Sequence, residues 1–455
     1  MSDLNKLRQE RKEIIEAVYD GKIPRRVPVD TNLPLELCIE YSGYPLGETQ
    51  WTLENMEEIY DRACQLIISD FYPFGFARYP AHLQILNAKA FVMSSKGVIQ
   101  HPEISGMEAN QYDDFIRNPY DFILEKVIPK LYPELDTDAV TRSIVLAKAV
   151  KAYYDYAETY LAIDGKMIEK YGFYVPPPGS FGGCTTPFDF LSDFNRGFRG
   201  ISMDIRRCPD KVAEACEAIL PLAFKNGLAP NPSKYGGTFI ALHMGPYLRT
   251  EDFEKLYWPT LYKLVHALAN AGQPSFLFCE QDWMRYLDYL YELPPNTRLW
   301  FEYGDAQKVK DKLGKKHIIS GFYPVAMLKT SSRQACIDKA KELIDILAPG
   351  GKFIFRFDKS PMLLQDINLE NYTAVLEYVM EYARYDNPGE HAAGEGKTYP
   401  TVEVSIPEFR SKYYQTWPEY KKTHPDINTA LEPVIAPKMQ YYEDLVMRFL
   451  YQLVL

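Results

Sequence analysis

Short apolar runs alternate with amphipathic segments over the second half of the chain. The runs are rich in β-branched and aromatic residues and lie at residues 172–177, 238–245, 274–280, 297–304, 316–324 and 352–358. Helical periodicity separates them, for example at residues 251–271, 306–313 and 333–347. Strands that alternate with helices predict a parallel sheet. Because most runs are apolar nearly throughout, we expect both faces of that sheet to be covered.

The first half of the chain supplies two further strand predictions. RRVPVD predicts a short strand over residues 25–30, and LIISDFYPFG predicts a strand that ends at Asp70, after a helix over residues 52–68. The stretch AFVMSSKGVIQH alternates like a hairpin with Lys96 and Gly97 at its turn. With these strands the total approaches eight, and so many βα units favour a (β/α)8 TIM barrel.

The remaining segments divide the chain around this barrel. We predict an N-terminal helix over residues 1–24 and the barrel over residues 25–385, with a helical insertion at about 112–170. The C-terminal extension covers residues 386–455 and begins with a Gly-, Pro- and Tyr-rich stretch before a helix at about 436–453. We expect this extension to wrap the barrel or to contact another subunit.

Composition narrows the class of protein. The 455 residues are 46% hydrophobic and 25% charged, as in a globular protein with a large core. The net charge of −10 leaves no basic footprint, so nucleic acid and anionic membranes are poor partners. The N-terminus has no apolar signal-peptide stretch, which predicts a soluble cytoplasmic protein. Seven scattered cysteines without a CxxC pair predict reduced thiols.

Polar residues at the predicted strand ends are the first functional candidates, because chemistry in a barrel lies at the carboxyl ends of its strands. These candidates are Asp70, His243, Cys279, Glu280, Glu302, Tyr323, Asp358 and Lys359. Cys279 and Glu280 are adjacent, so in a regular strand their side chains point to opposite faces, which favours a core position for Cys279. Glu280 is interpreted as a site residue rather than as a partner of Arg285.

Two loops receive a structural interpretation. We expect His101, in QHPE, to hold the predicted hairpin loop. PPPGS and GGCTTP, between residues 176 and 187, form a Gly-rich stretch without the GxxxxGK pattern of a phosphate loop. A mobile lid or substrate loop is the preferred interpretation of that stretch.

Several motifs are similar to those of the uroporphyrinogen decarboxylase superfamily, a TIM-barrel group that includes corrinoid-dependent methyltransferases. The similar segments are SSKGVIQHPEISGM at 94–107, TPFDFLSDFNRGFRGISMDIRRCPDKV at 186–212, ALHMGPYLRTEDFEKLYWPTL at 241–261, ELP at 292–294 and LENYTAVLEYVMEYARY at 369–385. Asp70, in ISDFYPFG, resembles the aspartate of that family's FSDI motif, which holds the substrate's pyrrole nitrogens. The resemblance implies the barrel fold and favours a homodimer.

The sequence departs from two functional patterns of this superfamily. The region that resembles the family's arginine-rich RQAGRY signature has no arginine between Arg26 and Arg62, and a substrate with eight carboxylates needs paired cations. The zinc methyltransferases of the superfamily have a His-x-Cys pair and a distant Cys as ligands. In this chain the pair falls on Leu277 and Cys279 and the distant position falls near Pro361, so only Cys279 remains. A rearranged zinc site of His243, Cys279 and Glu280 is left open, since all three are zinc ligands.

The resemblance therefore implies a methyltransferase that moves a methyl group from a small donor, such as a methoxylated aromatic (O-demethylation), to a corrinoid (cobalamin) on a partner protein. The chain has no DxHxxG corrinoid motif of its own. Glu280 and His243 are expected to act as the acid or Lewis-acid site, with Asp70 and Tyr72 orienting the donor, and the remaining substrate contacts are expected from Tyr174, Glu302, Tyr323 and Asp358. The alternatives are a decarboxylase of the uroporphyrinogen type and a non-catalytic ligand-binding relative.

Overall fold

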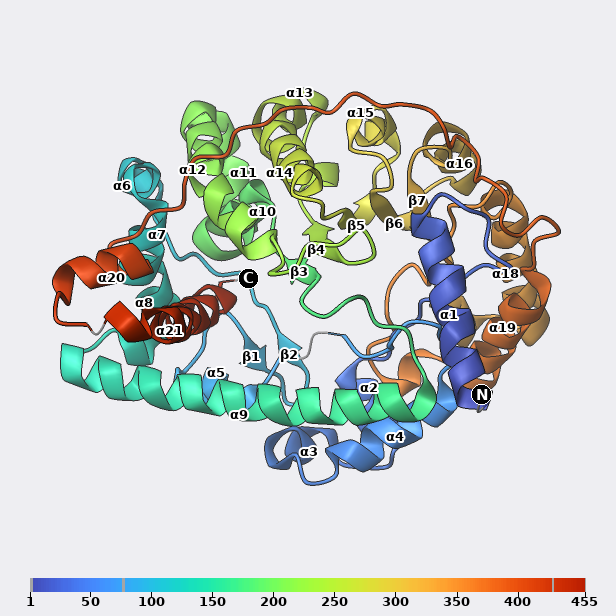
Figure 1. Ribbon diagram of the computed structural model, residues 1–455, viewed down its shortest axis with the longest axis horizontal. Helices are drawn as coiled ribbons and strands as arrows, with labels where there is room; N and C mark the ends of the chain where they lie inside the picture. Colours follow the sequence, from blue (N-terminus) through green and yellow to red (C-terminus); the bar gives the residue numbers. More distant parts are fainter. Residues whose placement is uncertain (1–2, 76–77, 428, 455) are drawn as a thin grey trace.

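A five-stranded parallel sheet forms the centre of the molecule (Figure 1). The computed structural model describes residues 3–75, 78–427 and 429–454. The strands follow the order β3-β4-β5-β6-β7, and their bounds are β3 (Phe181–Gly183), β4 (Gly237–Leu242), β5 (Ser275–Asp282), β6 (Arg298–Tyr303) and β7 (Ile318–Gly321). Four of the six predicted runs are therefore strands of one parallel sheet.

Backbone pairing continues beyond both edges of this sheet. Past β7, residues 353–357 pair with residues 319–323, and Phe355 forms a parallel bridge with Val29. The Asp70 amide donates to the Val29 carbonyl at 2.8 Å. Phe71 in turn forms a parallel bridge with Tyr174, which precedes β3. Short stretches near residues 29, 71 and 355 thus join the parallel arrangement, as their sequences predict.

The Gly-rich stretch before residue 187 is part of this arrangement. Phe181, Gly182 and Gly183 pair with Gly237, Thr238 and Phe239 of β4. Residues 181–183 of this stretch, predicted as a lid or substrate loop, are therefore a strand of the sheet. Glycine lowers strand propensity, and this strand forms because its backbone is paired with β4 and not because its sequence favours a strand.

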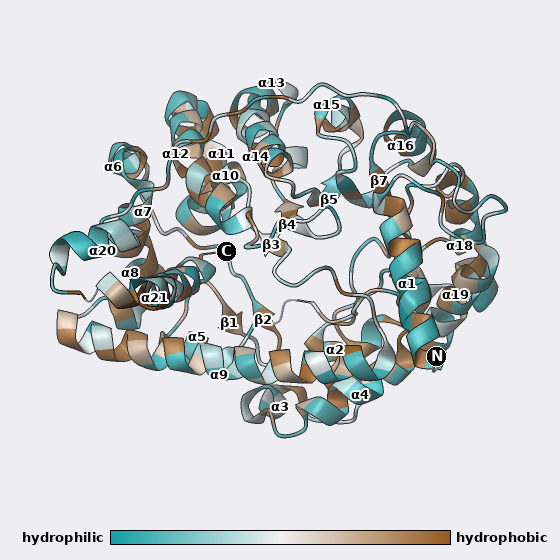
Figure 2. Cartoon of the chain, in the orientation of Figure 1, coloured by the Kyte–Doolittle hydropathy of each residue, from teal (hydrophilic) through white to brown (hydrophobic). Residues whose placement is uncertain are grey.

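Helices surround the sheet, and α10 to α16 connect its successive strands (Figure 1). The helices before β3 are α1 (Asp3–Tyr19), α2 (Leu35–Tyr41), α3 (Leu46–Thr52), α4 (Met56–Leu66), α5 (Pro80–Ile85), α6 (Tyr112–Arg117), α7 (Pro119–Phe122), α8 (Ile128–Leu131) and α9 (Ala139–Tyr171). The later ones are α10 (Pro187–Phe190), α11 (Gly197–Arg207), α12 (Pro209–Gly227), α13 (Thr250–Asp252), α14 (Trp258–Asn270), α15 (Leu287–Glu292), α16 (Ala306–Leu313), α17 (Met327–Thr330), α18 (Arg333–Leu347), α19 (Leu369–Tyr382), α20 (Trp417–Thr423) and α21 (Glu432–Gln452). Teal and brown residues alternate along most helices, as expected for helices with one face on a core (Figure 2).

Helix α1 covers the amino ends of the strands. Its buried Val18 packs with Ile318 and Ile354, which lie at the starts of their strands. Ile14 and Ile15 pack against Tyr174 in the same way. The amino side of the sheet is consequently covered by the N-terminal helix, and the carboxyl side is the side left for a site.

The predicted hairpin and the C-terminal extension are both present. Strands β1 (Val92–Met93) and β2 (Ile99–Gln100) pair antiparallel on either side of Lys96 and Gly97. The segment between α19 and α20 runs along the outside past α16, α15 and α13 (Figure 1). One of the contacts that hold it there is a hydrogen bond of 3.0 Å from the side-chain amide of Asn270 to the Val402 carbonyl oxygen.

Candidate active site

His243 lies between two carboxylates at the carboxyl end of β4. Its Nδ1 is 2.9 Å from Asp193 Oδ2, and its Nε2 is 3.4 Å from Glu280 Oε2. Asp193 comes from a π-helix that follows α10, whereas Glu280 lies in β5. The pairing of Leu242 with Cys279 explains the second contact, because the next residues of the two strands are His243 and Glu280.

The surroundings of His243 favour its charged form. Burial alone lowers the pKa of a histidine. Here the hydrogen bond to Asp193 and the negative charges of Asp189, Asp193 and Glu280 outweigh burial and raise the pKa of His243 to about 10. His243 is therefore an imidazolium at neutral pH, and its side chain keeps 40% of its surface exposed to solvent. A charged, accessible N–H group at a strand end can donate a proton or hold an anion.

Asp189, at the start of α10, holds the backbone on which His243 sits. It is completely buried, and its carboxylate accepts hydrogen bonds from the amides of His243 at 3.2 Å and Met244 at 2.9 Å. The Tyr257 hydroxyl donates to the same carboxylate at 2.7 Å. Burial raises the pKa of Asp189 to about 6, against the opposing charge of His243. Asp189 thus fixes the position of the histidine.

A second ion pair lies next to this group. Glu302, near the end of β6, is 2.7 Å from the ammonium of Lys359, and it also accepts a hydrogen bond from the Gln281 amide at 2.8 Å. Gln281 has a φ of 62° and lies in an irregularity of β5, where the pairing with β6 shifts register between Cys279 and Asp282. The carboxylate of Asp358 accepts the amides of Val325 and Lys359, both at 2.8 Å. Predicted residues from four strand ends therefore meet on the carboxyl side.

Negative charge exceeds positive charge in this group. Burial raises the pKa of the Glu280 carboxyl, and Glu302 and Asp193 add to this effect, while His243 and Lys359 oppose it. Burial likewise raises the pKa of Asp358. The hydrogen bond to Glu302 raises the pKa of Lys359. The two cations are thus committed to carboxylates that are already present.

The prediction for Asp70 is wrong, because Asp70 lies at the opposite end of its strand. It is completely buried and accepts two hydrogen bonds of 2.7 Å from the Arg26 guanidinium and one of 2.8 Å from the Val29 amide. Arg11 of α1 is 3.7 Å away. Strand pairing continues past Asp70 to Pro73, whose carbonyl accepts the Leu33 amide. Asp70 consequently has a structural ion-pairing role on the amino side.

The three predicted tyrosines also lie away from His243. Tyr72 points to α9, where its hydroxyl donates to Asp164. Tyr323 is buried, and its hydroxyl donates to the Cys336 carbonyl of α18 at 3.0 Å. Tyr174 packs against α1, as described above. Residues of a strand alternate between its two faces, and a tyrosine near a strand end therefore faces the helices as readily as the interior.

Of the three predicted zinc ligands, His243 and Glu280 lie together, but Cys279 does not join them. Cys279 is completely buried on the face of β5 opposite to Glu280, where burial raises the pKa of its thiol. Both ring nitrogens of His243 already face carboxylates. Over the part of the chain that the structure describes, no group of three or more His, Cys, Asp or Glu side chains has an arrangement suited to a metal ion. Cys279 thus points away from the side on which His243 and Glu280 meet.

Two nearby interpretations can be compared with the structure. His101 does hold the hairpin loop, with Nδ1 2.6 Å from the Ala90 carbonyl oxygen and Nε2 3.2 Å from that of Asp193. Arg285, considered as the partner of Glu280, instead donates to the carbonyls of Pro246 and Leu248. Glu280 thus has His243 as its charged partner.

Sequence reasoning missed Asp189 and Asp193. The available signal was TPFDFLSDF, in which Thr186 precedes Asp189 by three residues, the spacing of a helix N-cap. Thr186 does accept the Asp189 amide, at 3.0 Å. Nothing in that spacing indicates that both aspartates reach the end of β4, which is about 50 residues further along the chain.

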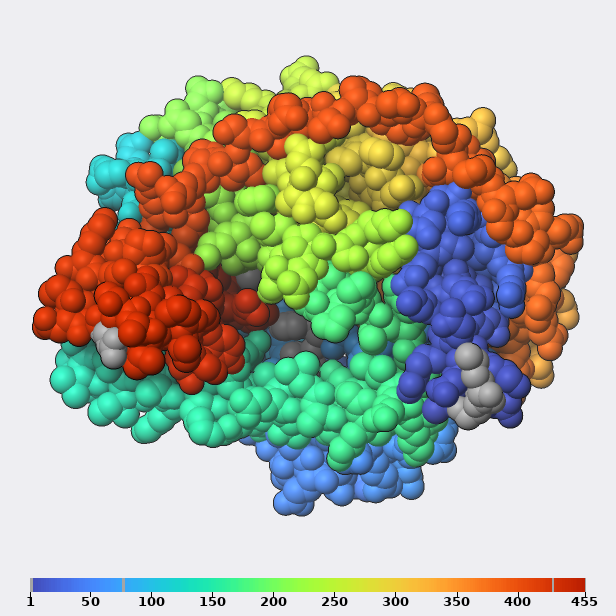
Figure 3. Space-filling model, viewed as in Figure 1, coloured from blue at the N-terminus to red at the C-terminus, as the bar shows by residue number. Residues whose placement is uncertain are grey.

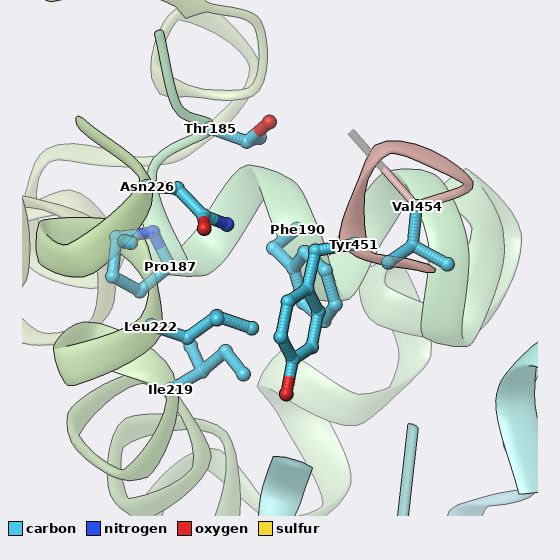
Figure 4. A pocket seen from close by; sticks show the side chains of 9 residues that line it. Thr185, Pro187, Phe190, Ile219, Leu222, Asn226, Tyr451 and Val454 are labelled. Carbon is cyan, nitrogen blue, oxygen red and sulfur yellow. The ribbon is translucent and has the colours of Figure 1, made fainter. Parts of the chain in front are cut away.

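A separate apolar cavity lies between α12 and the end of α21 (Figure 4). Uncharged residues line it, namely Thr185, Pro187, Phe190, Ile219, Leu222, Ala223, Asn226, Tyr451 and Val454. It holds no titratable pair of the His243–Glu280 kind, so it is a poorer candidate for acid–base chemistry.

Comparisons with known proteins place the chain in no family. No family model matches the sequence, and no curated protein matches it. Among the described residues, no helix is long and apolar enough to cross a lipid bilayer.

Proposed function

We propose that the parallel arrangement closes into a (β/α)8 barrel of the uroporphyrinogen decarboxylase type, with α1 and the residues after α19 as extensions. The bridges Val29–Phe355 and Phe71–Tyr174 support closure, because they link the segments beyond β7 back to the segment that contains β3. Counting residues 173–183 as one strand gives eight. The sequence motifs named above favour the same fold.

We infer that the chain is a methyltransferase that moves a methyl group from a small donor, such as a methoxylated aromatic, to a corrinoid protein. The observation that carries this inference is the position of His243 between Asp193 and Glu280, whose negative charges help to raise its pKa to about 10. A corrinoid carried by a partner protein would supply the nucleophile that accepts the methyl group. When the carbon–oxygen bond breaks, the departing oxygen needs a proton, because an alkoxide or phenoxide is a poor leaving group.

His243 is suited to deliver that proton from Nε2, the nitrogen that faces Glu280. Asp193 accepts the hydrogen bond from Nδ1 and fixes the orientation of the ring. Glu280, with 37% of its side chain exposed, can pass a proton from solvent to the imidazole after turnover. The products are the methylated acceptor and the donor's alcohol or phenol, so the proton and the electron pair of the broken bond are both accounted for.

Charge favours this reaction over decarboxylation. A substrate carboxylate at the strand ends would meet Asp193, Glu280, Glu302 and Asp358. The two cations there, His243 and Lys359, already pair with carboxylates. An additional anion would lie next to like charges, which is unfavourable at a partly buried site.

Two donors with different leaving groups test the role of His243. The assay follows demethylation of methoxybenzene with free cobalamin, reduced to Co(I), as the methyl acceptor. We expect His243→Gln to slow this reaction by a factor of about 10² to 10⁴, and Glu280→Gln to slow it by a smaller factor. The methyl ether of para-nitrophenol releases a stable anion, so His243→Gln should slow it far less. Cys279→Ala is the matched control and should leave both rates unchanged.

The outcomes separate the candidate functions. Equal loss on both donors would contradict proton donation by His243. Release of carbon dioxide from an aromatic acid without any methyl acceptor would instead support the decarboxylase. Donor binding without turnover in the unaltered protein would support a non-catalytic relative.

A further inference from the structure

A buried arginine of β6 lies on the same face of the sheet as the candidate active site. The Arg298 guanidinium lies over the Phe276 ring at 4.2 Å, and the two residues are paired in the sheet. Phe276 shares its face of β5 with Glu280, because side chains an even number of residues apart point the same way. Four residues of strand rise by about 13 Å. Arg298 therefore lies on this face well toward the amino ends of the strands.

A second arginine shares the counter-charge of Arg298. Arg356 comes from the segment that pairs with β7. Its Nη1 is 2.7 Å from Asp30 Oδ2, and Nη2 of Arg298 is 2.5 Å from the same oxygen. The three side chains keep 10%, 5% and 9% of their surface exposed. Burial raises the pKa of Asp30, but the two guanidiniums outweigh it and lower this pKa below its ordinary value. Because an arginine stays protonated, the group keeps one net positive charge.

The remaining contacts of the two guanidiniums are to neutral oxygens. Asp30 is the one carboxylate of the described residues within 4 Å of either of them. Nη2 of Arg356 donates to Asn32 Oδ1, and Nε of Arg298 donates to Ser320 Oγ, both at 3.1 Å. Nε of Arg356 is buried and has no hydrogen-bond partner among the described residues. Burial without an acceptor is costly, so the group lacks both a negative charge and an acceptor.

Partly exposed aromatic rings lie next to this group. The Arg356 guanidinium lies over the Trp300 ring at 4.1 Å, and Trp300 in turn stacks on Phe278 with centroids 4.0 Å apart. Phe239, Phe276 and Phe278 are only partly buried. The space-filling view shows the molecule hollowed between α9 and the segment around β3, the strand that pairs with β4 up to Phe239 (Figure 3). A planar apolar group can therefore contact rings beside the arginines.

We propose that the group formed by Arg298, Arg356 and Asp30 binds the carboxylate of an aromatic monocarboxylic acid. A carboxylate supplies one negative charge, which balances the group, and its two oxygens match the N–H groups of a guanidinium. The partly exposed rings offer stacking and edge contacts to the aromatic part of the ligand. The carboxylate anchors the ligand away from the acidic strand ends and does not itself meet His243. Binding needs neither a methyl group nor a corrinoid, so it is independent of the proposed reaction.

Calorimetric titration of the full chain with benzoate, in a buffer free of other small carboxylates, tests the proposed ligand class. We expect benzoate to bind at least about tenfold more tightly than benzamide, which has the same shape but no charge. Acetate, which has the carboxylate but no ring, should also bind about tenfold more weakly than benzoate. Equal affinities of benzoate and benzamide, or of benzoate and acetate, would overturn the proposal.

Variants of Arg356 test the location of the site. Arg356→Met leaves Arg298 and Asp30 as a neutral pair, so it should remove the preference for benzoate over benzamide. Arg356→Lys keeps the positive charge and should retain most of this preference. Arg410→Met is the control, because the Arg410 side chain is 83% exposed, and it should leave all three affinities unchanged. Circular dichroism melting checks that each variant is folded.

The outcomes separate this site from the methyltransferase function. A preference for benzoate that persists in Arg356→Met would overturn the site. Chloride that displaces benzoate as effectively as acetate does would indicate a site for any small anion and would overturn the ligand class. Benzoate that binds as expected in a protein without demethylation activity would leave the anion site standing and refute the reaction. Demethylation without benzoate binding would refute the anion site alone.

Discussion

The two ends of the parallel arrangement carry acidic residues with opposite properties. On the amino side, Asp70 is completely buried, and two hydrogen bonds from Arg26 satisfy it. On the carboxyl side, Asp193 and Glu280 share His243, and the three side chains keep 20%, 37% and 40% of their surface exposed. A closed ion pair stabilises the structure, whereas an exposed, charged histidine between two acids can exchange protons.

Breaking the amino-side pair should have the largest effect on stability. Asp70→Asn removes the buried counter-charge of Arg26 and leaves it only the partly exposed Glu10 at 3.5 Å, so we expect the free energy of unfolding to fall by about 3–5 kcal/mol. Urea denaturation measures it. Asp288→Asn is the control, because it breaks an ion pair with Lys312 in which the Asp288 side chain is 84% exposed. We expect it to lower the free energy of unfolding by no more than about 1 kcal/mol. A loss below about 1 kcal/mol in Asp70→Asn would remove the contrast between the two ends.

Asp193→Asn should have a smaller effect on stability, of about 1 kcal/mol after allowance for solvent screening. Its main consequence is a lower pKa of His243. The hydrogen bond from His243 to Asp193 is the largest of the interactions that raise this pKa to about 10, and an asparagine weakens it. The pH at which demethylation loses its proton donor should therefore move toward neutral. Titration of the His243 ring by NMR measures the shift, and an unchanged pKa would contradict the assigned role of Asp193.

The pH dependence of stability follows from the same shift. The pKa of His243 in the folded protein, about 10, lies above the unfolded value of about 6.5. Its contribution to stability is therefore complete below about pH 6.5 and is lost as the pH rises toward 10. The stability difference between the unaltered protein and Asp193→Asn should accordingly shrink over that range. Urea denaturation at several pH values would contradict this if the difference grew.

The smallest effect on the reaction is expected from Tyr72→Phe. It removes the hydrogen bond from the Tyr72 hydroxyl to Asp164 of α9, at a cost of about 1 kcal/mol in the free energy of unfolding. Because this hydroxyl faces α9, demethylation should keep its rate. A loss of turnover comparable to that of His243→Gln would mean that Tyr72 acts in the site after all.

The local pattern of the sequence was sufficient for most of the sheet and for part of the site. The runs at 238–245, 274–280 and 297–304 contain β4, β5 and β6, because apolar, β-branched and aromatic residues follow one another in each of them. Their polar ends indicated His243, Glu280 and Glu302, and the structure places all three side chains at the carboxyl ends of β4, β5 and β6. Glycine and proline made residues 176–187 resemble a loop, and only pairing with β4 makes Gly182 and Gly183 part of a strand.

What the sequence by itself determined is which polar residues interrupt the apolar strands, since that depends only on neighbouring residues. The tertiary structure decided at which end of the sheet each of them lies and what faces it. Asp70 and Glu280 both come after apolar runs, LII and FLFC, but the pairing of Val29 with Asp70 places the aspartate beside Arg26 on the amino side. Asp193 reaches His243 across 50 residues of chain. Such contacts arise from strand register and helix packing, which are properties of the whole fold and not of any local pattern.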